Sequence, residues 1–572
     1  MNRPLAVNPD HAIADPDVST SDGSGPDRGW RQRIQSWRRD PLSAGIALLL
    51  AVLVVMFILV PVAAIFVASV RAEEGITLEL YRTFLESEYY RASARNSLIL
   101  GLASTLVTIG FAIPLALYTT RTRGPLTAGF RMVSLLPLVA PPFIFALSLI
   151  TIGGRRGLLS QALGAVGIEG SIFGLHGIVI AQALGFFPVA YMLIEGALRS
   201  IDPALEHASR DCGASQLTTL RRVTIPAARS GIFKAFLIVF VLVLADFSNP
   251  VIIGGGQPTL ASDAYLLIVG RQNLSMAAVV GVVLIVPSIA VFLLQRRILG
   301  DATGEASLGG GDPLPLNPGI RRICLTLSWI IIGAIAVMFA FVVAGAFVRT
   351  LGVNNTFTLD HFATSRGLGY IRNSLLVAVL AALVASVLGV IQGFVLARKD
   401  VPVKGFQEFS SLFGLAVPGT VIGIGYVLVF NGAPFYLTGT ITILVLNMAF
   451  RNVGVSMSAA ISKLHQVDTA YEEASADLGA GPIRTFWRVA VPLLLPAFMS
   501  GFVYTFMTTM VTISSVVFLV SPGTNLAAVY ILNLANTAAI GEASAMSFLL
   551  ICSVLAILGA LRWLERRSNV GV

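Results

Sequence analysis

The sequence has little charge. Only 12% of its 572 residues are Asp, Glu, Lys or Arg, whereas 55% are hydrophobic and the mean hydropathy is +0.82. A soluble globular protein carries about 25% charged residues, so this deficit excludes a soluble enzyme, a nucleic-acid-binding domain and a disordered chain. The net charge of +9 lies mostly in short loops between long apolar runs, where it indicates membrane orientation. We therefore predict a polytopic membrane protein that contacts lipid and no nucleic acid.

Cysteine and the usual signatures of catalysis are also scarce. The three cysteines, Cys212, Cys324 and Cys552, lie far apart without metal-ligand spacing, which excludes a disulfide framework and a metal site. No G-x-x-x-x-G-K-[ST] phosphate loop, HExxH motif or arguable Ser–His–Asp set occurs. We predict that the chain is not an enzyme, has no catalytic residues and binds no cofactor, and that its energy comes from another subunit.

Twelve apolar runs are long enough to cross a bilayer, which takes about 20 residues. They lie at about 43–70, 96–118, 127–152, 172–194, 233–254, 275–295, 323–348, 373–397, 409–431, 437–459, 495–519 and 544–561. Residues 1–40 hold no apolar run, so we predict a tail rather than a cleaved signal peptide. With the N-terminus inside, 29 of the 39 Lys and Arg residues, counting Arg451, lie on the cytoplasmic side. Both termini are therefore predicted to be cytoplasmic.

The second half of the chain repeats the first. The tetrapeptide Arg-Asn-Ser-Leu at 95–98 recurs at 372–375, and Pro141 recurs as Pro418 at the same offset in the numbering. From Asp202, which recurs as Asp468, the offset is shorter, and the change falls near a longer external loop at Gly153–Gly170. Each repeat has six spans, an even number, so both halves insert the same way up.

These observations predict an all-α membrane protein with twelve transmembrane helices in two parallel six-helix repeats. The predicted organisation is a cytoplasmic tail at 1–40, a first unit at 41–299, a cytoplasmic linker at 300–319 and a second unit at 320–572. The linker is rich in Gly and Pro, which is typical of a flexible connection.

The most informative stretch lies between the fourth and fifth spans of each half, where residues 202–226 align with 468–492 over 25 positions without a gap. Asp202 and Asp468 are predicted N-caps of short helices that end at Gly213 and Gly479, where glycine allows the left-handed backbone of a sharp helix stop. A second short helix then leads to the next span. We predict a helix–Gly–helix elbow on the cytoplasmic face of each half.

One such elbow could merely seat a loop on the lipid as an amphipathic helix. Two copies in register, in equivalent loops, favour docking to a partner with twofold symmetry. The elbow resembles the Glu-Ala-Ala…Gly signature of the permease subunits of bacterial ATP-binding cassette importers. The matching residues are Glu206, His207, Ala208 and Gly213 in the first copy and Glu472, Glu473, Ala474 and Gly479 in the second. His207 and Glu473 stand where that family has its first alanine.

The resemblance covers nearly the whole chain after residue 40. It implies a type I importer permease fold, a location in the bacterial inner membrane, and elbows that act as coupling helices. It also implies two cytoplasmic ATP-binding cassette subunits, which use ATP and Mg, and a periplasmic or lipid-anchored substrate-binding protein. Transport would proceed by alternating access as the two ATPase subunits close and open beneath the elbows.

The candidate translocation path lies at the fifth spans. Asp246 is the only plainly deep acid, and it is followed by Ser248, Asn249 and a proline expected to break the helix. The matching place in the second half carries the hydroxyls of Thr512, Ser514 and Ser515. Irregular backbone at this depth is tolerated only where it is buried in protein or faces water. Asp246 is therefore either a buried acid that bonds the broken backbone or a group of the path.

The fusion of two units in one chain, with the fifth-span segments at 245–250 and 512–519, is similar to the fused permeases of ferric-iron importers. Ferric iron is therefore the predicted cargo. Close relatives of that group carry aminoalkylphosphonates, sugar phosphates, thiamine, sulfate or polyamines, and these alternatives stay open. A proton-coupled secondary carrier is disfavoured because it needs ionisable groups inside its spans, and this chain has few.

Overall fold

The computed structural model describes residues 41–568 with gaps at 73–74, 155–156, 158–159, 161–170, 300–312, 364, 400 and 402–403. The predicted tail at 1–40 lies outside the described residues, as do most of the loop Gly153–Gly170 and of the linker. The described residues are mainly helical. They also form two antiparallel hairpins, β1 (Arg71–Ala72) with β2 (Gly75–Ile76) and β3 (Val348–Thr350) with β4 (Asn354–Phe357).

The first half contains α2 (Pro41–Val54), η1 (Val55–Leu59), α3 (Val60–Val70), α4 (Glu79–Glu86), α5 (Glu88–Arg121), α6 (Pro125–Leu135), η2 (Leu136–Val139), α7 (Ile144–Gly153), α9 (Leu175–Arg199), α10 (Pro203–Asp211), α11 (Gln216–Thr219), η3 (Leu220–Thr224), α12 (Ile225–Ala245), α13 (Ser248–Ile253), α14 (Leu260–Val269) and α15 (Leu274–Leu299). Here η1 and η3 are π-helical turns and η2 is a 3₁₀ turn.

The second half contains α16 (Pro318–Phe347), η4 (Asp360–Phe362), α17 (Ser365–Arg398), α18 (Lys404–Ala416), α19 (Gly419–Phe430), α20 (Ile441–His465), α21 (Ala470–Asp477), α22 (Pro482–Thr485), η5 (Phe486–Ala490), α23 (Val491–Val511), α24 (Ala527–Asn536) and α25 (Ile540–Ser568). The π-helical turn η5 follows η3 at the same offset that relates Asp468 to Asp202, so the repeat extends to this local irregularity.

Ten helices among the described residues are long and apolar enough to cross a membrane, and two bent helix pairs raise the number to twelve. The bent pairs stand where the sequence predicts spans at 127–152 and 409–431. Pro125–Val139 meets Ile144–Gly153 at 102°, and Lys404–Ala416 meets Gly419–Phe430 at 109°. Counting each bent pair as one span gives the predicted number. The bends arise because the repeated prolines Pro141 and Pro418 fall in the two breaks and proline disrupts a helix interior.

The first span of each half packs against the bent pair of the other half. Helix α3 contacts α19 and η1 contacts α18, whereas α16 contacts α6 and α7. Hydrogen bonds join both crossings. The Tyr426 hydroxyl donates to the Phe57 carbonyl at 2.8 Å, and the Ser148 hydroxyl donates to the Met338 carbonyl at 2.9 Å. The two sequence repeats are therefore interlocked in space.

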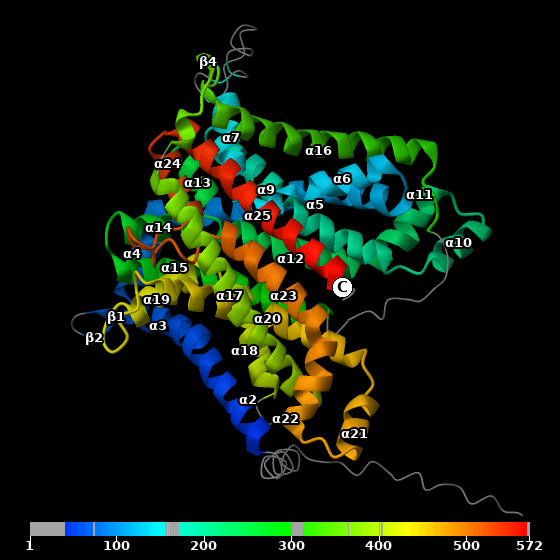
Figure 1. Cartoon of the computed structure of the whole chain (residues 1–572). Helices are drawn as coiled ribbons and strands as arrows, with labels where there is room; N and C mark the ends of the chain where they lie inside the picture. The colour runs from blue at the N-terminus through cyan, green and yellow to red at the C-terminus, as the bar shows by residue number, and fades with distance from the viewer. Residues whose placement is uncertain are drawn as a thin grey trace, which may run out of the picture.

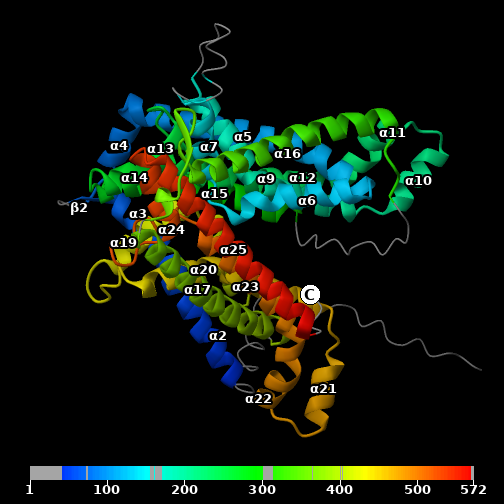
Figure 2. The same ribbon diagram turned by 45° about the horizontal axis from the view of Figure 1, so that its top comes forward.

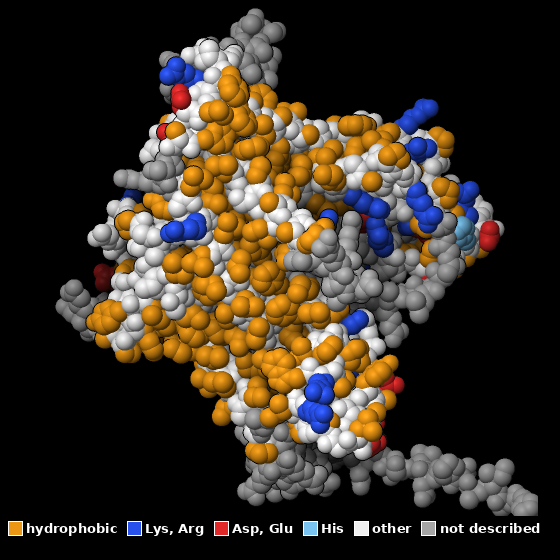
Figure 3. Space-filling view, viewed as in Figure 1, with side chains coloured by type: hydrophobic (Ala, Val, Ile, Leu, Met, Phe, Trp, Pro, Cys, Tyr) orange, Lys and Arg blue, Asp and Glu red, His pale blue; other side chains and the backbone are white. Residues whose placement is uncertain are grey.

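The helices form two arms that meet at one end and diverge toward the elbows. In Figures 1 and 2, α10 and α11 lie at the end of one arm, and α21 and α22 lie at the end of the other. Figure 3 shows apolar side chains spread across the middle of this face, with Lys and Arg gathered near the elbows and others at the opposite end. This distribution fits a membrane-spanning body whose elbows stand outside the apolar belt.

The repeated Arg-Asn-Ser-Leu tetrapeptide holds the short helices α14 and α24. Ser97 accepts the backbone N–H of Leu260 at 2.8 Å, and Ser374 accepts that of Ala527 at 2.8 Å. The neighbouring Asn side chains at 96 and 373 donate to loop carbonyls before the same helices. Each serine thus supplies, from a distant helix, an acceptor for an N–H group that a helix start leaves unpaired.

We expect Ser374→Ala to destabilise the protein more than Ser97→Ala. The start of α14 keeps a capping box between Thr259 and Ser262, whereas α24 has no side-chain cap of its own. Losing the acceptor should cost about 1 kcal/mol at Ser97 and about 2 kcal/mol at Ser374. Thermal unfolding of the purified variants checks the order, and a larger loss at Ser97 would contradict it.

Candidate functional site

Both predicted elbows form, and the first begins at its predicted N-cap. The Asp202 carboxylate accepts the N–H of Ala204 at 2.9 Å, and the Asp468 carboxylate accepts that of Ala470 at 3.0 Å. In the second elbow the residue just before the helix is Thr469, which makes no side-chain cap. Gly213 and Gly479 have φ values of +81° and +77°, the left-handed geometry that favours glycine after a helix.

A hydroxyl pair joins the two short helices of each elbow. Ser209 and Thr219 lie 3.0 Å apart between their hydroxyl oxygens, and Ser475 and Thr485 lie 2.9 Å apart. The two pairs occupy equivalent positions of the repeat. Each elbow is therefore closed by the same side-chain contact, which holds the angle that the glycine allows.

The first elbow is anchored by a buried ion pair. Glu206 turns inward and accepts from Arg121 Nη2 at 2.6 Å, with both side chains no more than 4% exposed. The same Glu206 oxygen accepts from the Thr224 hydroxyl at 2.8 Å. Arg121 ends α5 and Thr224 lies in η3, so one carboxylate links the elbow to the second and fifth spans.

The second elbow has the equivalent but more open pair. Glu472 accepts from Arg398 Nε at 2.8 Å, with the two side chains 23% and 10% exposed. Arg398 also donates to the Val467 carbonyl at 2.7 Å. The sequence analysis did not predict that Arg121 and Arg398 pair with the two glutamates. The signal was present, because Arg398 follows Arg121 at the same offset that relates the two Arg-Asn-Ser-Leu copies.

The residues after each glutamate face outward. His207, Ala208, Glu473 and Ala474 are not buried, and apolar side chains accompany them. Leu205 and Leu217 are about half exposed in the first elbow. The second elbow exposes Tyr471 (61%), Leu478 (89%), Ile483 (60%) and Trp487 (64%). Exposed apolar patches rimmed by polar residues are typical of protein-binding surfaces.

The end of the predicted linker contacts the first elbow. Gln216 donates to the Pro315 carbonyl at 2.7 Å and accepts the N–H of Asn317, while Leu316 is buried in the first-half core. Asn317 in turn caps α16, which begins at Pro318. Residues 313–317 are therefore held against the elbow, and residues 300–312 lie outside the described part of the chain.

Asp246 is enclosed in a hydrogen-bond network. Its carboxylate accepts from the Gln182 amide at 3.0 Å, the Ser248 hydroxyl at 2.7 Å and the Asn249 amide at 2.7 Å. It also accepts the N–H groups of Ser248 and Asn249, at the start of α13. The sequence predicted a helix break at Pro250, but the break falls at Asp246 and Phe247. Pro250 instead sits early in α13, where proline is tolerated. An internal space of only about 10 Å³ adjoins this network.

We expect Asp246→Ala to destabilise the fold rather than block the path. The change leaves the buried Asn249 amide without an acceptor and leaves the Gln182 amide only the Val243 carbonyl at 3.5 Å, at about 1–3 kcal/mol for each weakened donor. Asp246→Asn keeps one acceptor oxygen and should lose less. Both variants should transport normally per folded molecule, measured as uptake divided by the amount of protein in the membrane. A stable Asp246→Asn variant without uptake would instead place the carboxylate in the path.

The second-half counterparts are arranged differently. Thr512 and Ser514 are half-buried, and Ser515 is buried with its hydroxyl 3.4 Å from the Met448 sulfur. The structure thus brings Asp246, Ser248 and Asn249 together as a closed cluster. It leaves Thr512 and Ser514 partly open.

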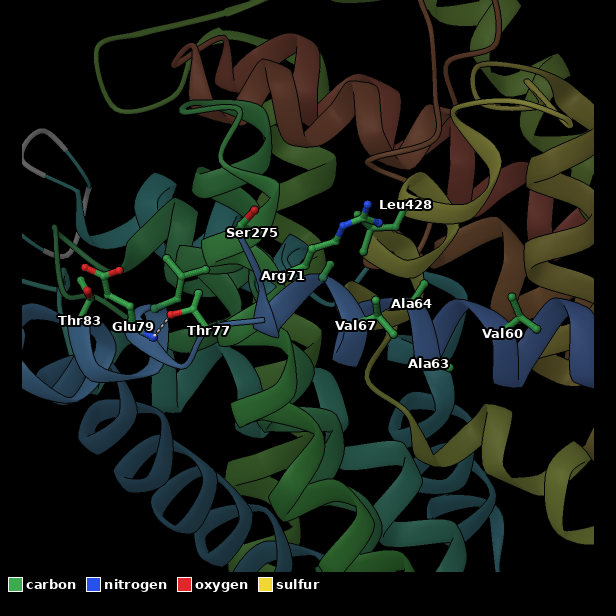
Figure 4. Close-up of a pocket in the computed structure, with 12 residues that line it drawn as sticks. Val60, Ala63, Ala64, Val67, Arg71, Thr77, Glu79, Thr83, Ser275 and Leu428 are labelled. Atoms are coloured by element: carbon green, nitrogen blue, oxygen red, sulfur yellow. Dashed lines mark hydrogen bonds between the residues drawn. The ribbon is translucent and has the colours of Figure 1, made fainter. Parts of the chain in front are cut away.

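A wide surface depression lies elsewhere. It has a volume of about 970 Å³ and is lined mainly by small apolar residues of α3, with Arg71, Glu79 and Ser275 at one end (Figure 4). None of the residues of the elbows or of the candidate path line it. Among the described residues, no group of three or more His, Cys, Asp or Glu side chains could hold a metal ion.

The chain matches a protein family twice, over residues 109–300 and 385–570. That family is described as the binding-protein-dependent transport system inner membrane component. The ferric transport system permease protein FbpB of Actinobacillus pleuropneumoniae is 32% identical over 554 residues, covering 94% of this chain and 80% of that protein. A putative ferric transport system permease protein, FbpB 1 of Haemophilus influenzae, is 32% identical over 84% of this chain and 79% of its own length. A solved chain of a bacterial alginate ABC transporter has a TM-score of 0.41 and 18% identity, covering 46% of this chain and 96% of that one.

Proposed function

Because this chain belongs to the family of binding-protein-dependent transport system inner membrane components, we propose that it is the permease through which ferric iron crosses the inner membrane. The observation that supports ferric iron as the cargo is the 32% identity to a ferric permease along 94% of the chain. The likeness spans both repeats, so it supports the fused arrangement as well as the cargo.

Membership of this family makes the chain a multi-pass permease subunit of the inner membrane, working with an ATPase and a substrate-binding protein. We propose that two ATPase subunits dock, one on each elbow, and that they alone bind and hydrolyse ATP with Mg. The chain itself is proposed to bind no cofactor and to keep both termini in the cytoplasm. The outward side chains at 207–208 and 473–474 and the exposed apolar residues beside them support this docking surface.

The inward glutamates provide the mechanical link. A displacement of the first elbow acts on α5 through the Glu206–Arg121 contact and on η3 through Thr224. The second elbow acts on α17 through the Glu472–Arg398 contact. Since each bent pair packs on the first span of the other half, movement of one arm is transmitted to the other. This arrangement supports alternating access by rocking of the two arms.

Uptake of labelled ferric iron by cells tests the proposal. Deletion of this chain, with ATPase and binding protein both present, should abolish uptake, and the wild-type chain should restore it. Unchanged iron uptake would overturn the cargo, and labelled phosphonate, sugar phosphate, thiamine, sulfate and polyamine would then be tested in the same cells. Uptake that survives ATP depletion but collapses with the proton gradient would overturn the importer mechanism.

A further inference from the structure

Unpaired buried polar atoms are concentrated in the second half of the molecule. Among the described residues, sixteen buried side-chain nitrogen or oxygen atoms lack a hydrogen-bond partner, and thirteen of them belong to residues after 320. Six of the thirteen lie on α20 and α23, in Asn447, Arg451, Ser456, Thr505 and Thr509. Buried polar groups are normally paired, so this concentration needs an explanation.

The first half offers a direct comparison because the repeat places equivalent residues there. At the offset that relates Asp468 to Asp202, Asn447 and Arg451 correspond to Ala181 and Gly185. Thr505 and Thr509 likewise correspond to the valines at 239 and 243. These four positions of the first half are therefore apolar. The polar face of α20 and α23 is a property of one half and not a requirement of the shared fold.

Arg451 is the charged member of this face. It lies near the middle of α20, and its place on the cytoplasmic side stays a prediction. Its Nη1 atom is buried without a partner, while the side chain as a whole keeps partial exposure. No acidic side chain of the described residues forms an ion pair with Arg451.

The chain makes room for this guanidinium. A Cβ atom at Gly419 would lie 2.8 Å from Arg451 Nη1 and closer still to the Ser514 hydroxyl oxygen. The first-half counterpart of Gly419 is Pro142, which lies beside Gly185, the counterpart of Arg451. The first half thus has the larger residue at the break (Pro142) and glycine on the neighbouring helix, whereas the second half has glycine at the break and Arg451 on the neighbouring helix. The break between α18 and α19 therefore leaves space for the guanidinium.

A cation without a counter-ion is costly at this depth. Ionisable groups inside membrane spans normally pair or face water, and mark substrate pathways by default. A guanidinium repels a bare ferric ion and binds oxyanions through two parallel N–H groups. The Ser514 hydroxyl, which lies beside Gly419 as the guanidinium does, is a neutral donor suited to the same oxygens.

We propose that Arg451 and Ser514 bind oxyanion oxygens of the cargo, so that iron crosses this permease coordinated by phosphate or carboxylate groups rather than as a bare cation. This inference deepens the proposed function and rests on it for the identity of the metal. The site sits beside the bend at Gly419, between α20 and the turn that follows α23.

Binding of inorganic phosphate to the purified full-length protein in lipid nanodiscs tests the site without reference to iron. We expect the wild type to bind labelled phosphate and Arg451→Gln to bind it at least tenfold more weakly. Lys463→Gln removes a positive charge from the last turn of the same helix and should bind as the wild type does. Gly419→Ala keeps the charge but displaces the guanidinium, so it should also weaken binding. Equal binding by wild type and Arg451→Gln, or none by the wild type, would overturn the proposal.

Thermal unfolding separates this role from a structural one. Removing an unpaired buried charge should stabilise the protein, so Arg451→Met should unfold about 2–4 °C higher than the wild type while its iron uptake falls at least tenfold. A structural arginine would lower both. A fall in unfolding temperature would therefore overturn the assignment.

Cells supplied with labelled iron and labelled phosphate distinguish the two sources of the oxyanion. Phosphate that enters only together with iron supports a ligand carried on the metal. Phosphate that enters without iron, and is lost in Arg451→Gln, supports the oxyanion site but refutes the iron cargo. Iron uptake by Arg451→Gln at the wild-type rate would refute the site and leave the ferric permease standing.

Discussion

Glu206→Ala is expected to lower the free energy of unfolding by about 3–5 kcal/mol, because it leaves Arg121 as an unpaired charge in a buried site. Arg121 is 4% exposed and cannot turn to water without moving the end of α5. Glu472→Ala should cost only about 1–2 kcal/mol, because the Glu472–Arg398 pair is partly solvated. Thermal unfolding of the purified variants, with the amount of each in the membrane, measures the difference.

A double substitution provides the control. Glu206→Leu with Arg121→Met replaces the buried pair by apolar side chains of similar size, which is often neutral or stabilising. We expect this double variant to recover most of the stability that Glu206→Ala loses. Equal losses for Glu206→Ala and Glu472→Ala, or no recovery in the double variant, would show that the ion pair does not anchor the first elbow.

The two elbows therefore share a plan but differ in attachment. The first has a buried ion pair and contacts residues 313–317, whereas the second has a half-open pair and the more apolar exposed surface. A partner that docks on the second elbow would cover more apolar area, while the first elbow is attached by the more buried contact. The repeat is symmetric in backbone and asymmetric in the side chains that determine stability.

Local rules explain which features the sequence could predict. The elbow depends on an Asp that caps a helix and a Gly that ends it, and both act within a few residues. The partner of Glu206 could not be found this way, since Arg121 is 85 residues away and meets it only through helix packing. The repeat does place an arginine at equivalent positions, 121 and 398, of the two halves, but hydropathy alone does not indicate that these arginines pair with the glutamates.

Hydropathy also cannot show the direction of a span. The segments at 127–152 and 409–431 are apolar over most of their length, yet the structure bends them by 102° and 109°. The prolines at the breaks were recognised as repeat markers rather than as bends. Arg451 was assigned to the cytoplasmic side from its expected position in a span. Comparison of the two repeats would also have shown that the first half has Gly185 at this position, so the arginine occurs in the second half alone.

Gly213→Pro or Gly479→Pro is expected to reduce ferric-iron uptake at least tenfold while the protein still inserts. Proline fixes φ at about −65°, whereas these residues need φ of +81° and +77°. Proline also removes an N–H that donates to the preceding helix, to Arg210 or Ala476 at 2.8 Å. The elbow should therefore lose its bend, so that ATP hydrolysis by the assembled complex continues without transport.

A graded series at the same positions isolates the backbone effect. An added Cβ at Gly213 or Gly479 meets no atom within 4 Å, so alanine changes no packing and costs only the left-handed strain of about 1–2 kcal/mol. Asparagine tolerates this backbone better and should retain most uptake, with alanine between asparagine and proline. Uptake and ATP hydrolysis measured together on all three variants test the elbow, because transport should fall in the order Asn, Ala, Pro while hydrolysis does not. Normal uptake in either proline variant would remove that elbow from the mechanism.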